Sequence, residues 1–129
     1  MNLGSILIFA GRPEEAVGLI EKAMRLNPRY PASYLLELGL AYRTVGRYEE
    51  ALAPLKKVLT LNPNFVPTHI NLAACYVELG REEEARAEAA EVLRLNPRFS
   101  LEVAKQNWPY KDPAALERYL DDLRKAGLK

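Results

Sequence analysis

Few side chains in this sequence are able to do chemistry, and their spacing does not assemble a reactive site. The 129 residues contain one histidine, His69, and one cysteine, Cys75, which together are too few for a closed zinc site. A neighbouring helix could bring the Ser33 hydroxyl to the imidazole, but no carboxylate is placed by spacing to orient the ring for nucleophilic catalysis. We therefore interpret His69 as a packed or half-exposed side chain, and we expect no enzyme activity and no metal site.

Two further groups have a structural interpretation. The acidic run 82–84 opens a predicted helix, where negative charge is favourable, so we interpret it as a solvated helix start rather than an acid–base pair. Cys75 falls in register with the inward-facing Ile6 and Ala41, which indicates a small buried residue rather than a nucleophile. No glycine-rich phosphate loop follows a strand, because no strand is predicted. We expect no cofactor.

The positions of these residues follow an internal repeat. The tripeptide Leu-Asn-Pro occurs at 26–28, 61–63 and 95–97, spaced 35 and then 34 residues apart. A fixed period in this range is typical of helical repeat arrays. Other columns keep the same register: Leu3, Leu38 and Leu72; Gly11, Gly46 and Gly80; Ala16, Ala51 and Ala85.

Each repeat is predicted to form two helices joined by a tight turn. In the range 31–45, Leu35, Leu38 and Tyr42 fall at i, i+3 and i+7 and so share one helical face. Gly46 ends this helix, since glycine adopts positive φ without a Cβ clash, and Pro63 ends the second helix. We expect burial between helices and between units at Tyr42, Leu55, Tyr76 and Val92.

Over roughly residues 1–99 the chain resembles the tetratricopeptide repeat family. In the middle unit the residues that carry the resemblance are Leu38-Gly39, Tyr42, Gly46, Tyr48, Ala51, Leu55, Val58 and Pro63. Departures are mild: Leu35 and His69 stand where the family often has tryptophan. The resemblance implies an all-α, right-handed superhelical solenoid whose first helices line a concave groove. It also implies protein or peptide binding as the usual task.

We expect one domain, residues 1–129, with repeats at about 1–30, 32–65 and 66–99 and a C-terminal cap at 100–129. In the cap, Asp112 is a candidate N-cap with Pro113 at the first helical position. The following apolar stripe consists of Leu116, Tyr119, Leu120 and Leu123. Trp108 and Tyr110 are expected to anchor this capping helix.

A narrower resemblance concerns the ending of the chain. The order of repeats and the segment 99–128 are similar to the C-terminal repeats of some bacterial signalling proteins that carry an adenylate cyclase-type or DNA-binding domain. The resemblance implies a regulatory segment of such a protein or a free-standing relative. Met1 falls in register with Leu36, so we expect a piece of a longer array, with translation starting inside a helix as the alternative.

Composition favours a soluble helical domain, with 49% hydrophobic and 27% charged residues and a net charge of +1. This charge gives no electrostatic reason to expect nucleic acid or an anionic membrane, and no apolar run is long enough to span a bilayer. A single cysteine suits a reducing cytoplasm, so we expect a cytoplasmic protein. Helical repeats that read RNA would need a basic groove, which this sequence does not supply.

The predicted binding surface is the outward face of the first helix in each unit. It is apolar at its centre and polar at its edges, which suits an apolar peptide or an amphipathic helix. The candidate groove residues are Ser5, Ile8 and Phe9 from the first unit, Ser33, Leu36, Glu37, Leu40, Arg43 and Thr44 from the second, and Ile70, Asn71, Ala74, Val77 and Glu78 from the third.

Occupants other than an external apolar peptide have different requirements. A neighbouring segment of the parent protein could fill the groove, or two copies could associate through the groove or the exposed ends of the array. The family's chaperone-tail binders clamp a terminal carboxylate with Lys, Arg and Asn. Ser5, Glu37 and Pro67 stand at several of the matching places, so that ligand is not expected.

Overall fold

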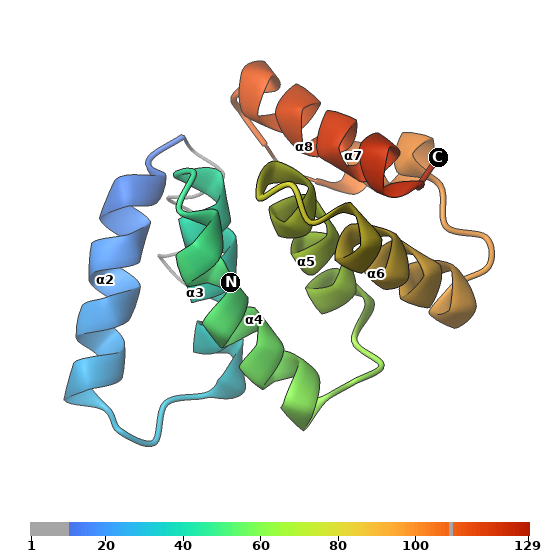
Figure 1. Cartoon of the computed structure of the whole chain (residues 1–129). Coiled ribbons are helices and arrows are strands. Elements are labelled where there is room, and N and C mark those ends of the chain that lie inside the picture. The colour runs from blue at the N-terminus through green and yellow to red at the C-terminus, as the bar shows by residue number, and fades with distance from the viewer. Residues whose placement is uncertain (1–10, 109) are drawn as a thin grey trace.

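A computed structural model describes residues 11–108 and 110–129, and all regular structure in these ranges is helical (Figure 1). The expected all-α class is therefore confirmed for this part of the chain. The helices are α2 (Pro13–Leu26), α3 (Ala32–Thr44), α4 (Tyr48–Leu61), α5 (Val66–Glu78), α6 (Glu82–Leu95), α7 (Leu101–Asn107) and α8 (Pro113–Ala126). The groove candidates Ser5, Ile8 and Phe9 lie outside the described residues.

The helices pack in the order of the sequence (Figure 1). Helix α3 lies against α4 and α5 lies against α6, as expected for the second and third repeats. Helix α2, the second helix of the first repeat, lies on the other side of α3, and α4 joins the two pairs by packing on α5. Each unit therefore buries an apolar face that it could not bury alone.

The turn between the two helices has the same form in the second and third units. Gly46 adopts φ +87°, and the Arg47 N–H donates to the Tyr42 carbonyl at 2.8 Å. The Arg47 guanidinium then lies 4.7 Å from the centre of the Tyr42 ring and donates to Glu50 at 2.6 and 2.7 Å. The same contacts recur with Gly80, Arg81, Tyr76 and Glu84. The Gly-Arg column of the repeat thus has a packing role.

The core follows the predicted columns. Tyr42 is 9% exposed and Tyr76 4%, whereas Leu55 and Val92 are fully buried, so the burial prediction is confirmed. Gly39 permits a close approach of α3 to the Leu55 side chain on α4, because a Cβ at this position would lie 2.6 Å from Leu55 Cγ and Cδ2. A small residue is required at this crossing.

The C-terminal segment contains the helix that the sequence predicted there, α8, with the predicted N-cap. The Asp112 side chain accepts a hydrogen bond from the Ala114 N–H at 3.0 Å, and α8 ends at Gly127, which adopts φ +110°. Leu120 and Leu123 are fully buried, and α8 packs mainly on α5 and to a lesser extent on α6. Helix α8 is therefore placed towards α5, the helix that carries the predicted groove face of the third repeat.

The contact between Gly39 and Leu55 gives the first prediction. Replacing Gly39 by Ala should lower the free energy of unfolding by about 1–3 kcal/mol, because the added methyl overpacks a filled site. Leu55→Ala alone should cost about 2–5 kcal/mol. Combined with Gly39→Ala, it should cost less than the sum of the two single changes. Urea denaturation monitored by circular dichroism measures each value.

Gly18 supplies the control. It lies exposed inside α2, and a Cβ there would meet no described atom within 4 Å. Gly18→Ala should therefore raise stability by about 0.5–1 kcal/mol, the usual helix-propensity gain. Equal effects of the two glycine substitutions would show that close packing at Gly39 is not what selects glycine there.

Candidate functional site

The structure divides the predicted groove residues into a buried set and an accessible set. The buried residues are Glu37, Arg43, Ile70, Asn71 and Ala74. Ser33 is exposed, and the half-buried residues are Leu36, Leu40, Thr44, Val77 and Glu78. The face predicted to be open along both helices is therefore covered over much of α5 and over the C-terminal end of α3, because α8 lies towards this side of the array.

Arg43 is the point at which the C-terminal segment meets the predicted groove. Its Nε–H donates to Asn71 Oδ1 at 2.8 Å, and an Nη2–H donates to the Tyr110 hydroxyl. The guanidinium carbon lies 3.8 Å from the centre of the Tyr119 ring on α8. Trp108 also packs against Tyr119, with the ring centres 5.0 Å apart. Trp108 and Tyr110 thus act as the predicted anchors of α8, and Tyr110 contacts the groove candidate Arg43.

A second polar contact ties α8 to α5. Arg118 donates to both carboxylate oxygens of Glu78, at 2.7 and 3.0 Å. Hydrogen bonds, chiefly those from Arg118, hold the pKa of Glu78 well below its usual range. Burial, and then a hydrogen bond to Glu78, raise the pKa of Asp122 well above its usual range. At neutral pH the two carboxyl groups therefore share one proton.

The accessible part of the predicted groove lies at the N-terminal end of α3. An apolar depression with a volume of about 230 Å³ opens there. Its lining residues are Ala32, Ser33, Leu36, Val58, Leu61, Asn62 and Phe65. Leu61 is 61% exposed and Phe65 is 37% exposed, so apolar surface remains available for contact.

Sequence reasoning missed Val58, Leu61 and Phe65 as part of this surface. The repeat pattern assigned them to the second helix and to the connection after it, so they were not considered with the first helices. They join Leu36 because the end of α4 packs beside the start of α3. The available signal was the leucine that precedes Asn-Pro in each repeat, and the structure shows Leu26 and Leu61 exposed.

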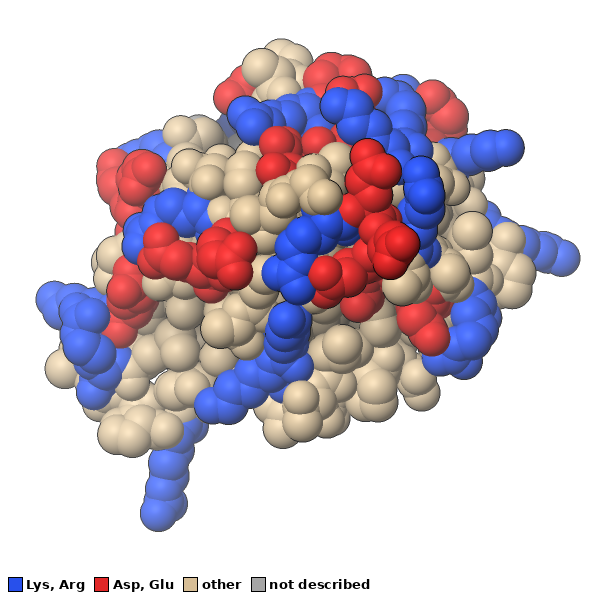
Figure 2. All heavy atoms as spheres, viewed as in Figure 1, with Lys and Arg blue, Asp and Glu red and all other residues tan. Residues whose placement is uncertain are grey.

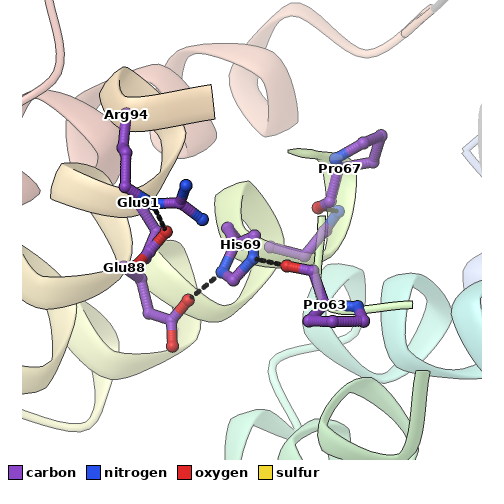
Figure 3. A network of polar contacts seen from close by, with 7 residues as sticks. Pro63, Pro67, His69, Glu88, Glu91 and Arg94 are labelled. Carbon is purple, nitrogen blue, oxygen red and sulfur yellow. Dashed lines mark hydrogen bonds and ion pairs between the residues drawn. The ribbon is translucent and has the colours of Figure 1, made fainter. Parts of the chain in front are cut away.

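His69 has a carboxylate partner that its sequence neighbourhood does not reveal (Figure 3). Glu88 on α6 lies 2.6 Å from His69 Nδ1, and the Pro63 carbonyl lies 2.7 Å from Nε2. Sequence spacing indicated no carboxylate that would orient the ring, and the structure supplies one from another helix. The carbonyl can only accept, so Nε2 carries a proton. Both ring nitrogens are engaged and the side chain is 5% exposed, so the prediction of a packed histidine is confirmed.

The remaining candidates for chemistry also have structural roles. Cys75 is fully buried, and burial raises the pKa of its thiol to about 12, which removes thiolate character at neutral pH. Within residues 11–108 and 110–129, no three His, Cys, Asp or Glu side chains are grouped as metal ligands. None of the described helices has the length and apolar character needed to cross a membrane. Figure 2 shows cationic and anionic side chains interspersed over the visible face.

Stacked helical pairs with an accessible apolar surface define a helical-repeat interaction domain. Two models of one family, described as tetratricopeptide repeat, match residues 1–64 and 42–105. The chain therefore belongs to the tetratricopeptide repeat family. Its sequence matches no protein of curated function.

Solved structures agree with this assignment. PcrH from Pseudomonas aeruginosa is 22% identical, and the match covers 96% of this chain and 86% of PcrH with a TM-score of 0.67. A structure described as MamA MSR-1 C2 is 26% identical over 96% of this chain and 71% of its own, also with a TM-score of 0.67. TTC0263, a thermophilic repeat protein in Thermus thermophilus, is 32% identical over 89% of this chain and 52% of its own, with a TM-score of 0.58.

The contact between His69 and Glu88 gives the second prediction. Glu88→Ala should lower the free energy of unfolding by about 1–3 kcal/mol, because it leaves a buried ring nitrogen without a partner. Glu88→Gln should retain most of the stability, since the amide can donate to Nδ1 of a neutral ring. Glu91→Ala, which removes an exposed ion pair with Arg94, is the control in urea denaturation. Equal losses in the Ala and Gln variants at Glu88 would contradict the role of this hydrogen bond.

The shared proton of Glu78 and Asp122 gives the third prediction. The unfolded chain loses this proton above about pH 4, whereas the folded chain retains it. Stability should therefore fall as the pH rises from about 4 towards neutrality, by at most about 1.4 kcal/mol per pH unit from this pair. Asp122→Asn should remove that decline and keep an amide donor to Glu78.

Asp121 provides the matched control, because it is an exposed neighbour on α8 that pairs with Lys125 at 3.4 Å. The measurement is the free energy of unfolding of each variant between pH 4 and pH 8. Asp121→Asn should follow the wild-type profile. An Asp122→Asn profile parallel to wild type over the whole range would show that Asp122 is ionised in the folded protein.

Proposed function

We propose that this chain is a protein-interaction module that binds an apolar peptide or an amphipathic helix at the N-terminal half of α3. The observation that carries this proposal is the apolar depression beside Leu36, with Leu61 and Phe65 partly exposed at its rim. Apolar surface gains about 25 cal/mol per Å² when a partner removes it from water. A volume of about 230 Å³ is below that of typical small-molecule pockets, which favours a partner's side chain over a drug-sized ligand.

The relatives support the class of function. Tetratricopeptide repeat proteins serve as protein-interaction scaffolds, and PcrH has been crystallised in complex with the chaperone binding regions of PopD and PopB. Those structures are 22% and 21% identical to this chain, so they support the fold and the class but not a shared ligand. The residues of the depression define what this chain would accept.

The proposed contact surface extends along the concave side. Leu36 and Leu40 supply its apolar centre, and Ser33 and Thr44 supply polar groups at its edges. Val77 and Glu78 continue it on α5, and Ser5, Ile8 and Phe9 are proposed to extend it from the first unit. The buried candidates hold this surface from beneath. Binding should be of the order of micromolar affinity, because an extended peptide loses conformational entropy when it is ordered.

Self-association is the second candidate function. Leu26 is 75% exposed and Leu61 is 61% exposed, and both belong to the Leu-Asn-Pro ends of second helices. Exposed leucines repeated at the same edge of an array could pair two copies. The mass in solution, measured by light scattering over a range of concentrations, separates a dimer from a monomer that binds peptide.

The fourth prediction tests the depression. Selection of a random peptide library against the chain should enrich peptides with apolar residues three or four positions apart. Leu61→Glu and Leu36→Glu should weaken binding of the enriched peptides by at least about tenfold, because each places a charge against apolar surface. Leu61→Glu is the safer variant, since its side chain is already largely exposed.

Val103→Glu is the matched control. Val103 is 59% exposed on α7, away from the depression, so the change should leave peptide binding intact. Thermal melting checks that each variant is folded. Retention of the enriched peptides by both folded depression variants, or equal loss in the Val103 variant, would rule out this surface as the binding site.

A further inference from the structure

Among the described residues, Arg43 is a buried positive charge without a negative partner. Its residue is 7% exposed, and in the part of the chain that the structure describes no carboxylate forms an ion pair with it. Arginine is rarely buried unless it is paired, because removing the charge from water costs several kcal/mol. The Tyr119 ring and two neutral acceptors offset only part of this cost.

The Arg43 guanidinium has N–H donors that are not bonded to any described residue. Of its five N–H groups, one on Nε and one on Nη2 are bonded to described residues, and none on Nη1 is. Thr68 Oγ1 is the only described buried side-chain N or O atom that lacks a partner. Nη1 is therefore not a fully buried atom without a partner, and Arg43 is one of the residues that line a cavity.

This cavity lies between the C-terminal end of α3 and α8 and has a volume of about 120 Å³. Arg43, Tyr48, Tyr110, Ala115, Arg118 and Asp122 are among its lining residues. It is separate from the apolar depression, which lies at the opposite end of α3. It also differs from the positions of a chaperone-tail clamp, which correspond here to Ser5, Glu37 and Pro67.

The charges around the cavity favour a single negative charge. Arg43 and Arg118 contribute two positive charges, and Glu78 neutralises that of Arg118. Asp122 retains its proton, since burial and Glu78 raise its pKa. The net charge is then +1, which a monoanion balances and a phosphate dianion exceeds. The planar guanidinium also matches a carboxylate in geometry.

We propose that the cavity between α3 and α8 is a binding site for one carboxylate group, held by the Arg43 guanidinium. The site is too small for a large ligand, so the carboxylate belongs either to a small free acid or to the end of a chain that enters the cavity. A free acid would fill the site whether or not a peptide binds at the depression.

Titration with sodium acetate tests the site, with sodium chloride at equal ionic strength as the reference and inorganic phosphate as the competitor. Amide resonances of residues 43–46 and of Ala115 should shift in a saturable way with acetate. Phosphate should act at least about tenfold more weakly. Shifts that are linear in concentration, or that are the same in chloride, would overturn the proposal.

Two variants identify the group responsible. Arg43→Gln should abolish the saturable response. Ala115→Leu should also abolish it by filling the cavity, while leaving Arg43 and the core intact, because Ala115 is half-exposed on α8. Ala114→Leu, at the exposed neighbouring position, should bind acetate as wild type does. If Arg43→Gln fails to fold, the two alanine variants decide, and equal acetate binding in both would overturn the proposal.

Two versions of the tripeptide Ala-Leu-Leu distinguish the source of the carboxylate. If the form with a free C-terminus binds at least about tenfold more tightly than acetate, and the amidated form does not bind, the carboxylate is that of a peptide. If the free form only equals acetate, the site serves small free acids. If Leu61→Glu does not weaken binding of the enriched library peptides while acetate still binds at the cavity, the proposed function is rejected and this site stands.

Discussion

The close approach of α3 and α4 at Gly39 sets the spacing on which the other contacts depend. Leu55 fills the space that a Cβ would occupy, and the two helices lie near enough to bury their apolar faces against each other. The turn at Gly46 then fixes the direction of α4, with Arg47 stacked on Tyr42. Because α4 also packs on α5, the geometry of one unit is passed to the next.

Helix α8 packs on the last described helical pair by a contact that is partly electrostatic. A cap usually needs an apolar face to cover the last repeat, and Leu120 and Leu123 supply it. Here α8 also brings Tyr119 over Arg43 and brings Arg118 to Glu78. Helix α8 therefore packs over α5 and leaves the start of α3 accessible. Burial of Arg43 costs free energy, and a carboxylate in the adjoining cavity would offset this cost.

Membership of the repeat family explains the fold, whereas the function depends on side chains that the family does not share. The depression beside Leu36 is apolar and accessible, whereas the cavity beside Arg43 is lined by charged and polar side chains as well as apolar ones. They lie at opposite ends of α3, so one helix presents two surfaces of different chemistry. His69, the residue most suggestive of catalysis in the sequence, instead links α5 to α6 and to the turn that precedes α5 (Figure 3).

The sequence by itself determined the helices, the turn glycines, the buried columns such as Leu55 and Val92, and the cap of α8 at Asp112. These depend on local periodicity, glycine and proline placement and side-chain capping, which act between residues close in the chain. Only the tertiary structure decided that Glu88 pairs with His69 and that α8 covers the groove face of α5. It alone also left Arg43 buried without an acid among the described residues. These outcomes depend on contacts between segments far apart in the chain. Which polar groups meet there is decided by the positions of the helices and by burial, and periodicity encodes neither.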